Sequence, residues 1–169
     1  PNTALVLFVQ SHHAEQRGTV SLPDVVKIAR ERQTPVLVDA AAEEDLRAYL
    51  AAGADLVTYS GGKAIGGPTS GFVAGRRDLI DGVRAQGHGV GRPMKVSKEQ
   101  LVGFAVALDE YLRAEAGLTA RRNERSARLV ELLQNIPGLG ISLARDEAGR
   151  DITSCLLYTS DAADDLTRV

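Results

Sequence analysis

The sequence predicts an α/β fold in which helices pack against a mostly parallel sheet. Two observations predict it: short apolar runs alternate with segments of helical periodicity, and polar residues follow directly where apolar runs end. Strands that alternate with helices are typical of parallel sheets, whose ligands bind beyond the carboxyl ends of the strands. We therefore expect the functional residues to gather at one edge of the sheet.

The composition is that of an ordinary soluble globular protein. Of 169 residues, 44% are hydrophobic and 25% are charged, which suits one domain with a good core. The net charge of −2 excludes a global basic field for nucleic acid or membranes, and no apolar run approaches the ~18 residues that span a bilayer. The single Cys155 excludes an internal disulfide framework and a cysteine-built metal site. We expect a cytoplasmic protein without a membrane partner.

The first elements follow from apolar runs and helix caps. Residues 4–9 are continuously apolar, as expected for a strand covered on both faces. Ser21 caps a helix that ends before Thr34, because a residue that precedes proline is pushed out of the helical region. Residues 36–38 then form a short buried strand that delivers Asp39 to its carboxyl end.

The next segment repeats the pattern. Residues 45–52 are predicted to be helical, and Gly53 suits the stop of that helix. A strand over residues 56–59 leads into a glycine-rich turn, and residues 71–75 form one more strand. Residues 78–86 are predicted to form the next helix.

The pattern changes after Pro93. Ser97 with Gln100 three residues later resembles a capping box, and apolar residues recur at helical spacing from residue 101 to residue 112. A second helix is predicted from about Thr119, with arginines on its outer side. Residues 141–144 read as a strand of a second, smaller domain.

Lys63 and Asp39 are the two residues that constrain the chemistry most. Lys63 lies among glycines just after a strand, where it can approach a cofactor closely, form an imine with its aldehyde and later move a proton. Asp39 can hold a proton on a pyridine nitrogen. Alone, Lys63 reads as a surface lysine and Asp39 as a helix cap. Together they favour a pyridoxal phosphate site, because such enzymes need both groups.

The turn before Lys63 offers groups for an anion. Ser60 and the backbone amides of Gly61 and Gly62 could contact the cofactor phosphate, since successive N–H groups form an anion nest. The alternative is a simple turn serine. The turn is not a Walker A loop, which needs Ser or Thr directly after the lysine, where this chain has Ala64.

Other polar groups follow two of the predicted strands. Ser11, His12 and His13 come after the first strand, where a side chain could bond the cofactor ring oxygen or stack on the ring. Two adjacent histidines are weak evidence of a metal site, and we expect no metal. The acidic run over residues 43–45 is predicted to be a solvated helix start, where acids favour the helix dipole.

A glycine-rich segment over residues 87–95 carries His88, Arg92 and Lys95. An arginine fork binds both oxygens of a carboxylate or phosphate, so Arg92 is predicted to anchor an anionic substrate, with Lys95 beside it. The alternative is an interdomain linker with solvated charges.

Three segments carry a resemblance to a known family. They run over residues 36–44 (VLVDAAAEE), 55–71 (DLVTYSGGKAIGGPTSG) and 89–96 (GVGRPMKV). Within roughly residues 4–154 the chain resembles the selenocysteine synthase-like branch of fold-type I pyridoxal phosphate enzymes, most closely the D-glucosaminate-6-phosphate ammonia lyase (dehydratase) family. The resemblance implies a three-layer αβα large domain and the start of a small α+β C-terminal domain.

The resemblance also implies roles for the residues. Lys63 would be the Schiff-base lysine, Asp39 the pyridinium partner and Ser60 a phosphate ligand, while His12 or His13 would lie near the ring and Arg92 on the substrate side. The implied reaction is α,β-elimination from a 2-amino-3-hydroxy acid, with D-glucosaminate 6-phosphate giving 2-keto-3-deoxy-6-phosphogluconate and ammonia. The implied assembly is a homodimer or a larger homo-oligomer with active sites between subunits.

Two other functions remain open at this point. One is selenium transfer to seryl-tRNA, which uses the same elimination and needs an RNA-binding surface. The arginines between Arg113 and Arg128 could provide that surface, although they read more simply as a solvated helix face. The other is a catalytically inactive domain kept for assembly.

We expect the chain to be a fragment of a longer parent enzyme and to be inactive alone. Residues 1–92 would be the C-terminal part of the cofactor-binding large domain, and residues 93–154 the linking helix and the start of the small domain. Residues 155–169 resemble translated sequencing-adapter read-through, a string that recurs on unrelated sequences. They are therefore left out of the predicted fold.

Overall fold

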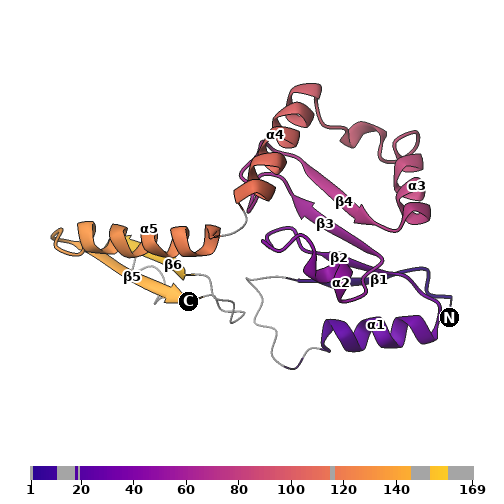
Figure 1. The fold of residues 1–169 in the computed structure, drawn as a ribbon, viewed down its shortest axis with the longest axis horizontal. Helices are drawn as coiled ribbons and strands as arrows, with labels where there is room; N and C mark the ends of the chain where they lie inside the picture. Colours follow the sequence, from indigo (N-terminus) through magenta and orange to yellow (C-terminus); the bar gives the residue numbers. More distant parts are fainter. Residues whose placement is uncertain (1, 11–17, 19, 115–116, 146–152, 160–169) are drawn as a thin grey trace. The chain divides into compact units, whose positions relative to one another are not determined.

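The computed structural model describes residues 2–10, 18, 20–114, 117–145 and 153–159 (Figure 1). The chain forms two compact units. The first contains residues 1–11 and 16–113, and the second contains residues 12–15 and 114–169. The predicted boundary at residue 92 therefore falls inside the first unit and remains a prediction about the domains of the parent.

The first unit is built on a four-stranded sheet in the order β1-β2-β3-β4 (Figure 1). Its strands are β1 (Val6–Val9), β2 (Val36–Asp39), β3 (Leu56–Ser60) and β4 (Gly71–Gly75). The first three strands are parallel, and β4 runs antiparallel to β3. The predicted α/β fold with a mostly parallel sheet is confirmed.

Two helices of this unit start where the sequence predicts caps. In α1 (Leu22–Glu31) the Ser21 hydroxyl accepts a hydrogen bond from the Asp24 amide. Further along come α3 (Arg77–Gln86), the short 3-10 helix η1 (Arg92–Met94) and α4 (Lys98–Ala114). The capping box of α4 is confirmed, because Ser97 and Gln100 exchange backbone-to-side-chain hydrogen bonds of 3.0 and 3.2 Å. No helix in the described ranges is long and apolar enough to cross a membrane.

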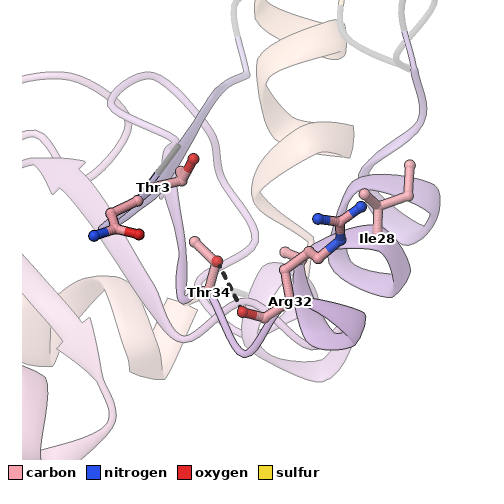
Figure 2. Close-up of a pocket in the computed structure, with 6 residues that line it drawn as sticks. Thr3, Ile28, Arg32 and Thr34 are labelled. Atoms are coloured by element: carbon pink, nitrogen blue, oxygen red, sulfur yellow. Dashed lines mark hydrogen bonds between the residues drawn. The ribbon is translucent and has the colours of Figure 1, made fainter.

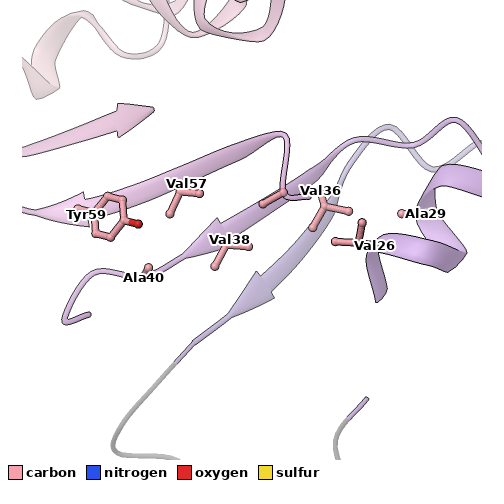
Figure 3. Close-up of a cluster of buried hydrophobic side chains, with 8 residues drawn as sticks. Val26, Ala29, Val36, Val38, Ala40, Val57 and Tyr59 are labelled. Atoms are coloured by element: carbon pink, nitrogen blue, oxygen red, sulfur yellow. The ribbon is translucent and has the colours of Figure 1, made fainter. Parts of the chain in front are cut away.

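The core lies on one face of the sheet (Figure 3). Val36 and Val38 of β2 and Val57 of β3 are fully buried there, and α1 packs Val26 and Ala29 against them. On the same face the ring of Tyr59 in β3 stacks on Phe72 in β4, with centroids 5.1 Å apart. Phe72 in turn contacts Phe104 of α4 in a tilted arrangement, with centroids 5.6 Å apart. Side chains alternate along a strand, so the opposite face carries Leu37, Asp39, Thr58 and Ser60.

The first strand is shorter and more exposed than predicted. It pairs with β2 only from Val6 to Val9, because β2 itself has four residues. Leu7 and Val9 are 59% and 50% exposed, whereas Val6 and Phe8 are half-buried and pack toward the core. The expectation of a strand covered on both faces is wrong for this unit, since only the face with Val6 and Phe8 is packed.

The helix predicted over residues 45–52 is also shorter, with α2 limited to Ala48–Ala51. The Asp45 carboxylate accepts hydrogen bonds of 2.8 and 2.9 Å from the amides of Arg47 and Ala48. This turn satisfies the amides outside the helix and delays its start. The predicted stop at Gly53 fits its φ of +103°.

The second unit contains α5 (Leu118–Leu133), which packs on an antiparallel pair of strands, β5 (Leu139–Arg145) and β6 (Thr153–Thr159). The strand predicted at residues 141–144 is confirmed within β5. The predicted fold omitted β6, because residues from Cys155 onward were excluded. In the structure this segment pairs residue for residue with β5, from Leu139↔Thr159 to Arg145↔Thr153.

We predict that Gly75→Ala lowers the free energy of unfolding by about 3 kcal/mol. Gly75 has a φ of +148°, and an added Cβ would overlap the Asp55 carbonyl oxygen, which also accepts a hydrogen bond from the Arg76 amide. Thermal denaturation should show a fall in Tm of roughly 6–12 °C.

The matched control is Gly82→Ala in α3, where no atom lies within 4 Å of an added Cβ. Alanine in a helix interior should raise the free energy of unfolding by about 0.5–1 kcal/mol. Equal effects of the two substitutions would contradict the tight approach of β4 to Asp55.

Candidate functional site

Asp39 and Ser60 end two neighbouring parallel strands at the same edge of the sheet. The register pairs Asp39 of β2 with Thr58 of β3, and Ser60 lies two residues further on the same face. All three side chains are half-buried, on the face opposite the core. Two predicted site residues are therefore adjacent at the carboxyl edge, where α/β sheets bind ligands.

The Asp39 carboxylate is held through one of its oxygens. Oδ1 accepts a hydrogen bond from the Ala41 amide and another from the Thr58 hydroxyl, each 3.2 Å long. No partner of Oδ2 is recorded within the described part of the chain. One carboxylate oxygen is thus fixed and the other is available to a ligand.

Lys63 lies in a turn over residues 61–65 that directly follows β3. The turn is closed by hydrogen bonds from the Gly66 amide to the Lys63 carbonyl (3.0 Å) and from the Gly67 amide to the Gly61 carbonyl (2.7 Å). The Lys63 side chain is exposed. The turn fixes the backbone three residues beyond Ser60 and leaves the amine free to reach a ligand at the sheet edge.

The groups predicted to bind a phosphate differ in availability. The Gly61 amide donates to the Ser70 carbonyl (2.9 Å), so the expectation that it joins an anion nest is wrong. Across the described residues, no partner is recorded for the Ser60 hydroxyl or for the amides of Gly62 and Lys63. A Cβ at Gly62 would meet nothing closer than 3.7 Å, so its backbone is accessible to an anion.

A buried polar cluster holds the loop that follows Asp39, and the sequence analysis missed it. Glu43 is only 5% exposed and accepts a hydrogen bond from the Tyr49 hydroxyl (2.9 Å), so its predicted solvated position is wrong. The hydroxyls of Tyr59 and Tyr111 donate to the carbonyls of Asp45 and Glu44, at 3.0 and 2.6 Å. Tyr59 ends an apolar run and Tyr111 shares the helical spacing of the apolar residues 101–112, which is the one signal that could have indicated a buried hydroxyl in need of an acceptor.

Tyr59 has a shifted pKa because of this environment. Burial, with the nearby carboxylates of Asp45 and Glu43, raises the pKa of Tyr59 to about 12 from its ordinary value of 10.0. Both effects disfavour the phenolate. The hydroxyl therefore remains a donor to the Asp45 carbonyl at every physiological pH.

The other predicted site residues are not brought to this edge by any recorded contact. Arg92 and Lys95 are exposed, Arg92 at the start of η1 and Lys95 just after it. Among the described residues, no hydrogen bond or ion pair joins either of them to Asp39, Ser60 or Lys63. Ser11, His12 and His13 lie outside the described residues. No cluster of three or more metal-binding side chains is found among the residues that the structure describes.

An open hollow of about 540 Å³ lies elsewhere on the first unit (Figure 2). It is lined by residues before β1 and by the end of α1, among them Thr3, Ile28, Arg32 and Thr34. These residues flank the amino ends of β1 and β2, away from the carboxyl ends that carry Asp39 and Ser60. None of the predicted site residues lines this hollow.

The chain matches one family model and is similar to several curated proteins. The family model described as L-seryl-tRNA selenium transferase (SelA) matches residues 1–124. The chain is 45% identical over 150 residues to D-glucosaminate-6-phosphate ammonia lyase of Salmonella typhimurium, covering 89% of this chain and 40% of that protein. It is 47% identical over 163 residues to 5'-C-glycyluridine monooxygenase-decarboxylase of a Streptomyces species, covering 95% and 41%.

The fold agrees with a solved structure as well. The structure of D-glucosaminate-6-phosphate ammonia-lyase matches with a TM-score of 0.74 and 42% identity, over 95% of this chain and 42% of that chain. The predicted fold class, a three-layer α/β arrangement of this lyase type, is thereby confirmed. The chain spans about two fifths of the length of the curated relatives it matches.

We predict that Tyr59 titrates well above an ordinary tyrosine. Because its proton is held to about pH 12 in the folded state and to about pH 10 in the unfolded state, its stabilising contribution is complete below pH 10 and is lost between pH 10 and 12. A tyrosinate absorbance titration should show a late phase that is missing in Tyr59→Phe. Tyr158→Phe, which removes an exposed tyrosine, should keep that phase. A wild-type titration complete by pH 11 would contradict the burial argument.

Proposed function

We propose, on the basis that this chain belongs to the L-seryl-tRNA selenium transferase family, that its full-length parent is a pyridoxal phosphate-dependent lyase. The parent would carry out α,β-elimination on a 2-amino-3-hydroxy acid. The observation that carries the proposal is the placement of Asp39, Ser60 and Lys63 at one sheet edge, with groups still available for a ligand. The likeness to D-glucosaminate-6-phosphate ammonia lyase supports this reaction.

The proposed substrate is D-glucosaminate 6-phosphate. Loss of its α-proton and of its β-hydroxyl as water gives an enamine, which takes up water again and releases ammonia. The products are 2-keto-3-deoxy-6-phosphogluconate and ammonia. A substrate with a carboxylate at one end and a phosphate at the other needs two cationic partners, for which Arg92 and Lys95 are the proposed residues.

The residues present fit pyridoxal phosphate. Asp39 offers Oδ2 to the pyridine N–H, the Ser60 hydroxyl and Gly62 amide are donors without a recorded protein partner in the described chain, and the Lys63 amine is exposed. A Cβ at Gly61 would clash with the Ser70 hydroxyl and with Phe104, so the turn is tightly packed at Gly61. At Gly62 no atom lies closer than 3.7 Å to an added Cβ, so the turn is open there. The protonated pyridine nitrogen of the cofactor matches the Asp39 carboxylate, and its phosphate matches the donors at Ser60 and Gly62.

When bound, pyridoxal phosphate supplies an electron sink for the substrate's α-carbon. Lys63 is the proposed base that removes the α-proton, and the resulting ammonium can pass its proton to the leaving hydroxyl. Asp39 holds the proton on the ring nitrogen, which keeps the sink effective. Ser60 and Gly62 bind the phosphate and so fix the orientation of the site. Ser11, His12 and His13 remain proposed ring contacts, and homo-oligomeric assembly remains part of the proposal.

A second candidate is oxidative decarboxylation. The likeness to the monooxygenase-decarboxylase is as strong as that to the ammonia lyase, and it covers slightly more of this chain. The same lysine and aspartate would serve that reaction, because it also withdraws electrons from a bond at the α-carbon. Consumption of O₂ and release of CO₂ from a 2-amino acid, in place of ammonia release, would favour this second candidate.

Selenium transfer to seryl-tRNA is a weaker candidate on electrostatic grounds. Arg113 and Arg128 at the two ends of the arginine-rich segment pair with Asp109 and Glu131, at 2.7 and 2.8 Å. These two arginines, paired and exposed, are typical of a solvated helix face and add little net charge for a phosphate backbone. A salt-dependent shift of seryl-tRNA by the parent would revive this candidate, and a parent that neither binds the cofactor nor reacts would support an inactive assembly domain.

We predict that the full-length parent releases ammonia and 2-keto-3-deoxy-6-phosphogluconate from D-glucosaminate 6-phosphate, and that Lys63→Ala reduces the rate by about 10⁴-fold. Borohydride reduction followed by peptide mapping should attach the cofactor to the peptide that carries Lys63. Lys27→Ala, an exposed lysine in α1, is the control and should change neither result. A loaded parent that forms neither product would refute the proposed substrate.

We predict that Asp39→Asn leaves attachment of the cofactor intact and lowers kcat by about 10- to 150-fold. The reason is the loss of a charged hydrogen bond worth about 1.5–3 kcal/mol. Asp81→Asn, at an exposed site on α3, is the matched control. Steady-state kinetics on both variants tests the assignment, and equal kcat values in all three proteins would remove Asp39 from the mechanism.

A further inference from the structure

Thr58 carries a hydroxyl group and lies in β3, an interior strand of the sheet. The proposed mechanism gives this residue no role. It is flanked by Val57 and Tyr59, which point to the core, and it lies on the opposite face between Leu56 and Ser60. A half-buried hydroxyl costs free energy unless it is hydrogen-bonded. Valine has nearly the same shape as threonine and also suits a strand, so shape alone does not account for a threonine here. The reason for a threonine must then lie in the contacts of its hydroxyl group.

The register of the sheet decides that contact. Thr58 is paired with Asp39 across two parallel strands, and paired side chains on one face lie about 5 Å apart at their bases. The Thr58 hydroxyl lies 3.2 Å from Asp39 Oδ1 and 3.5 Å from the Val38 carbonyl. A hydroxyl has one proton to donate. It goes to Asp39, because that oxygen is nearer and carries charge.

These hydrogen bonds fix the orientation of the Asp39 carboxylate. The Ala41 amide donates to the same Oδ1 that Thr58 binds, so both donors act on one oxygen and stop the carboxylate from rotating. No partner of Oδ2 is recorded in the described chain. The loop that contains Ala41 is fixed in turn, because the Ala41 carbonyl accepts a hydrogen bond from the Ser60 amide (3.1 Å).

We propose that Thr58 is a positioning residue, which holds Asp39 so that Oδ2 faces the ring nitrogen of the cofactor. This inference rests on the proposed function, since it assigns the orientation of the same site. It adds a residue that acts through Asp39 and touches neither substrate nor cofactor.

The test is a double-mutant cycle in the full-length parent loaded with pyridoxal phosphate. Thr58→Val removes the hydroxyl at nearly constant volume and should lower kcat about tenfold, with KM changed by less than about twofold. Thr58→Ser keeps the hydroxyl and should restore kcat to within about twofold of wild type. In an Asp39→Asn background, Thr58→Val should have no further effect on kcat, because the charged oxygen that Thr58 is proposed to position against the ring nitrogen is gone.

A second readout does not depend on activity. In the parent without cofactor, urea unfolding of the wild type, the two single variants and the double variant should show coupling between Thr58→Val and Asp39→Ala, which removes the acceptor, by a factor of about five to ten in the unfolding equilibrium constant. Absence of this coupling would mean that the hydrogen bond does not form and would overturn the inference.

The kinetic outcomes separate the two proposals. A loaded parent in which Thr58→Val lowers kcat equally in the wild-type and in the Asp39→Asn background would overturn the positioning role and leave the proposed function standing. So would a Thr58→Ser variant that behaves like Thr58→Val. A parent that takes up no cofactor on Lys63 would overturn the proposed function and this inference together, whatever the unfolding cycle shows.

Discussion

The parallel pairing of β2 with β3 is the constraint on which the candidate site depends. Its register sets Asp39 against Thr58, and the two-residue period of β3 then puts Ser60 on the same face. A slip of one residue would turn Thr58 and Ser60 into the core and bring Val57 and Tyr59 to the ligand side. Burial of Val38 and Val57, both fully buried, opposes such a slip, so the apolar core fixes the geometry of the polar edge.

The loop after Asp39 is fixed by a different kind of interaction. Hydroxyls of Tyr59 and Tyr111 bind its carbonyls, and Tyr49 binds the carboxylate of Glu43. These bonds are partly buried, where an unpaired partner is costly. Tyr111 belongs to α4, 67 residues from its acceptor in the chain, so the sheet edge and α4 hold the loop between them. The loop that orients Asp39 is thereby part of the core.

Local signals in the sequence were enough for much of the fold. The caps at Ser21 and Ser97 depend on residues three positions away, and both form as predicted. Asp39 at the end of β2 followed from an apolar run. The contact between Thr58 and Asp39 was not predictable, because it depends on the register of two strands. Burial of Glu43 was hidden for the same reason: an acidic run reads as solvated until distant tyrosines are placed around it. The last strand was missed because its residues were excluded.

The proposed site would suit both reactions named among the relatives, that of the ammonia lyase and that of the monooxygenase-decarboxylase. Asp39 and Ser60 are proposed to bind the cofactor, Thr58 to position Asp39, and Lys63 to act as the base at the α-carbon. None of them is assigned to the substrate's anionic ends. Which bond at the α-carbon breaks would depend on how the substrate is oriented when the cofactor is bound. The orientation of the substrate would be set by the residues that hold its anionic ends. Arginine forks do this with a defined angle, whereas a lysine acts as a point charge. The choice of reaction is therefore expected to depend on the environment of Arg92, and much less on the sheet edge itself.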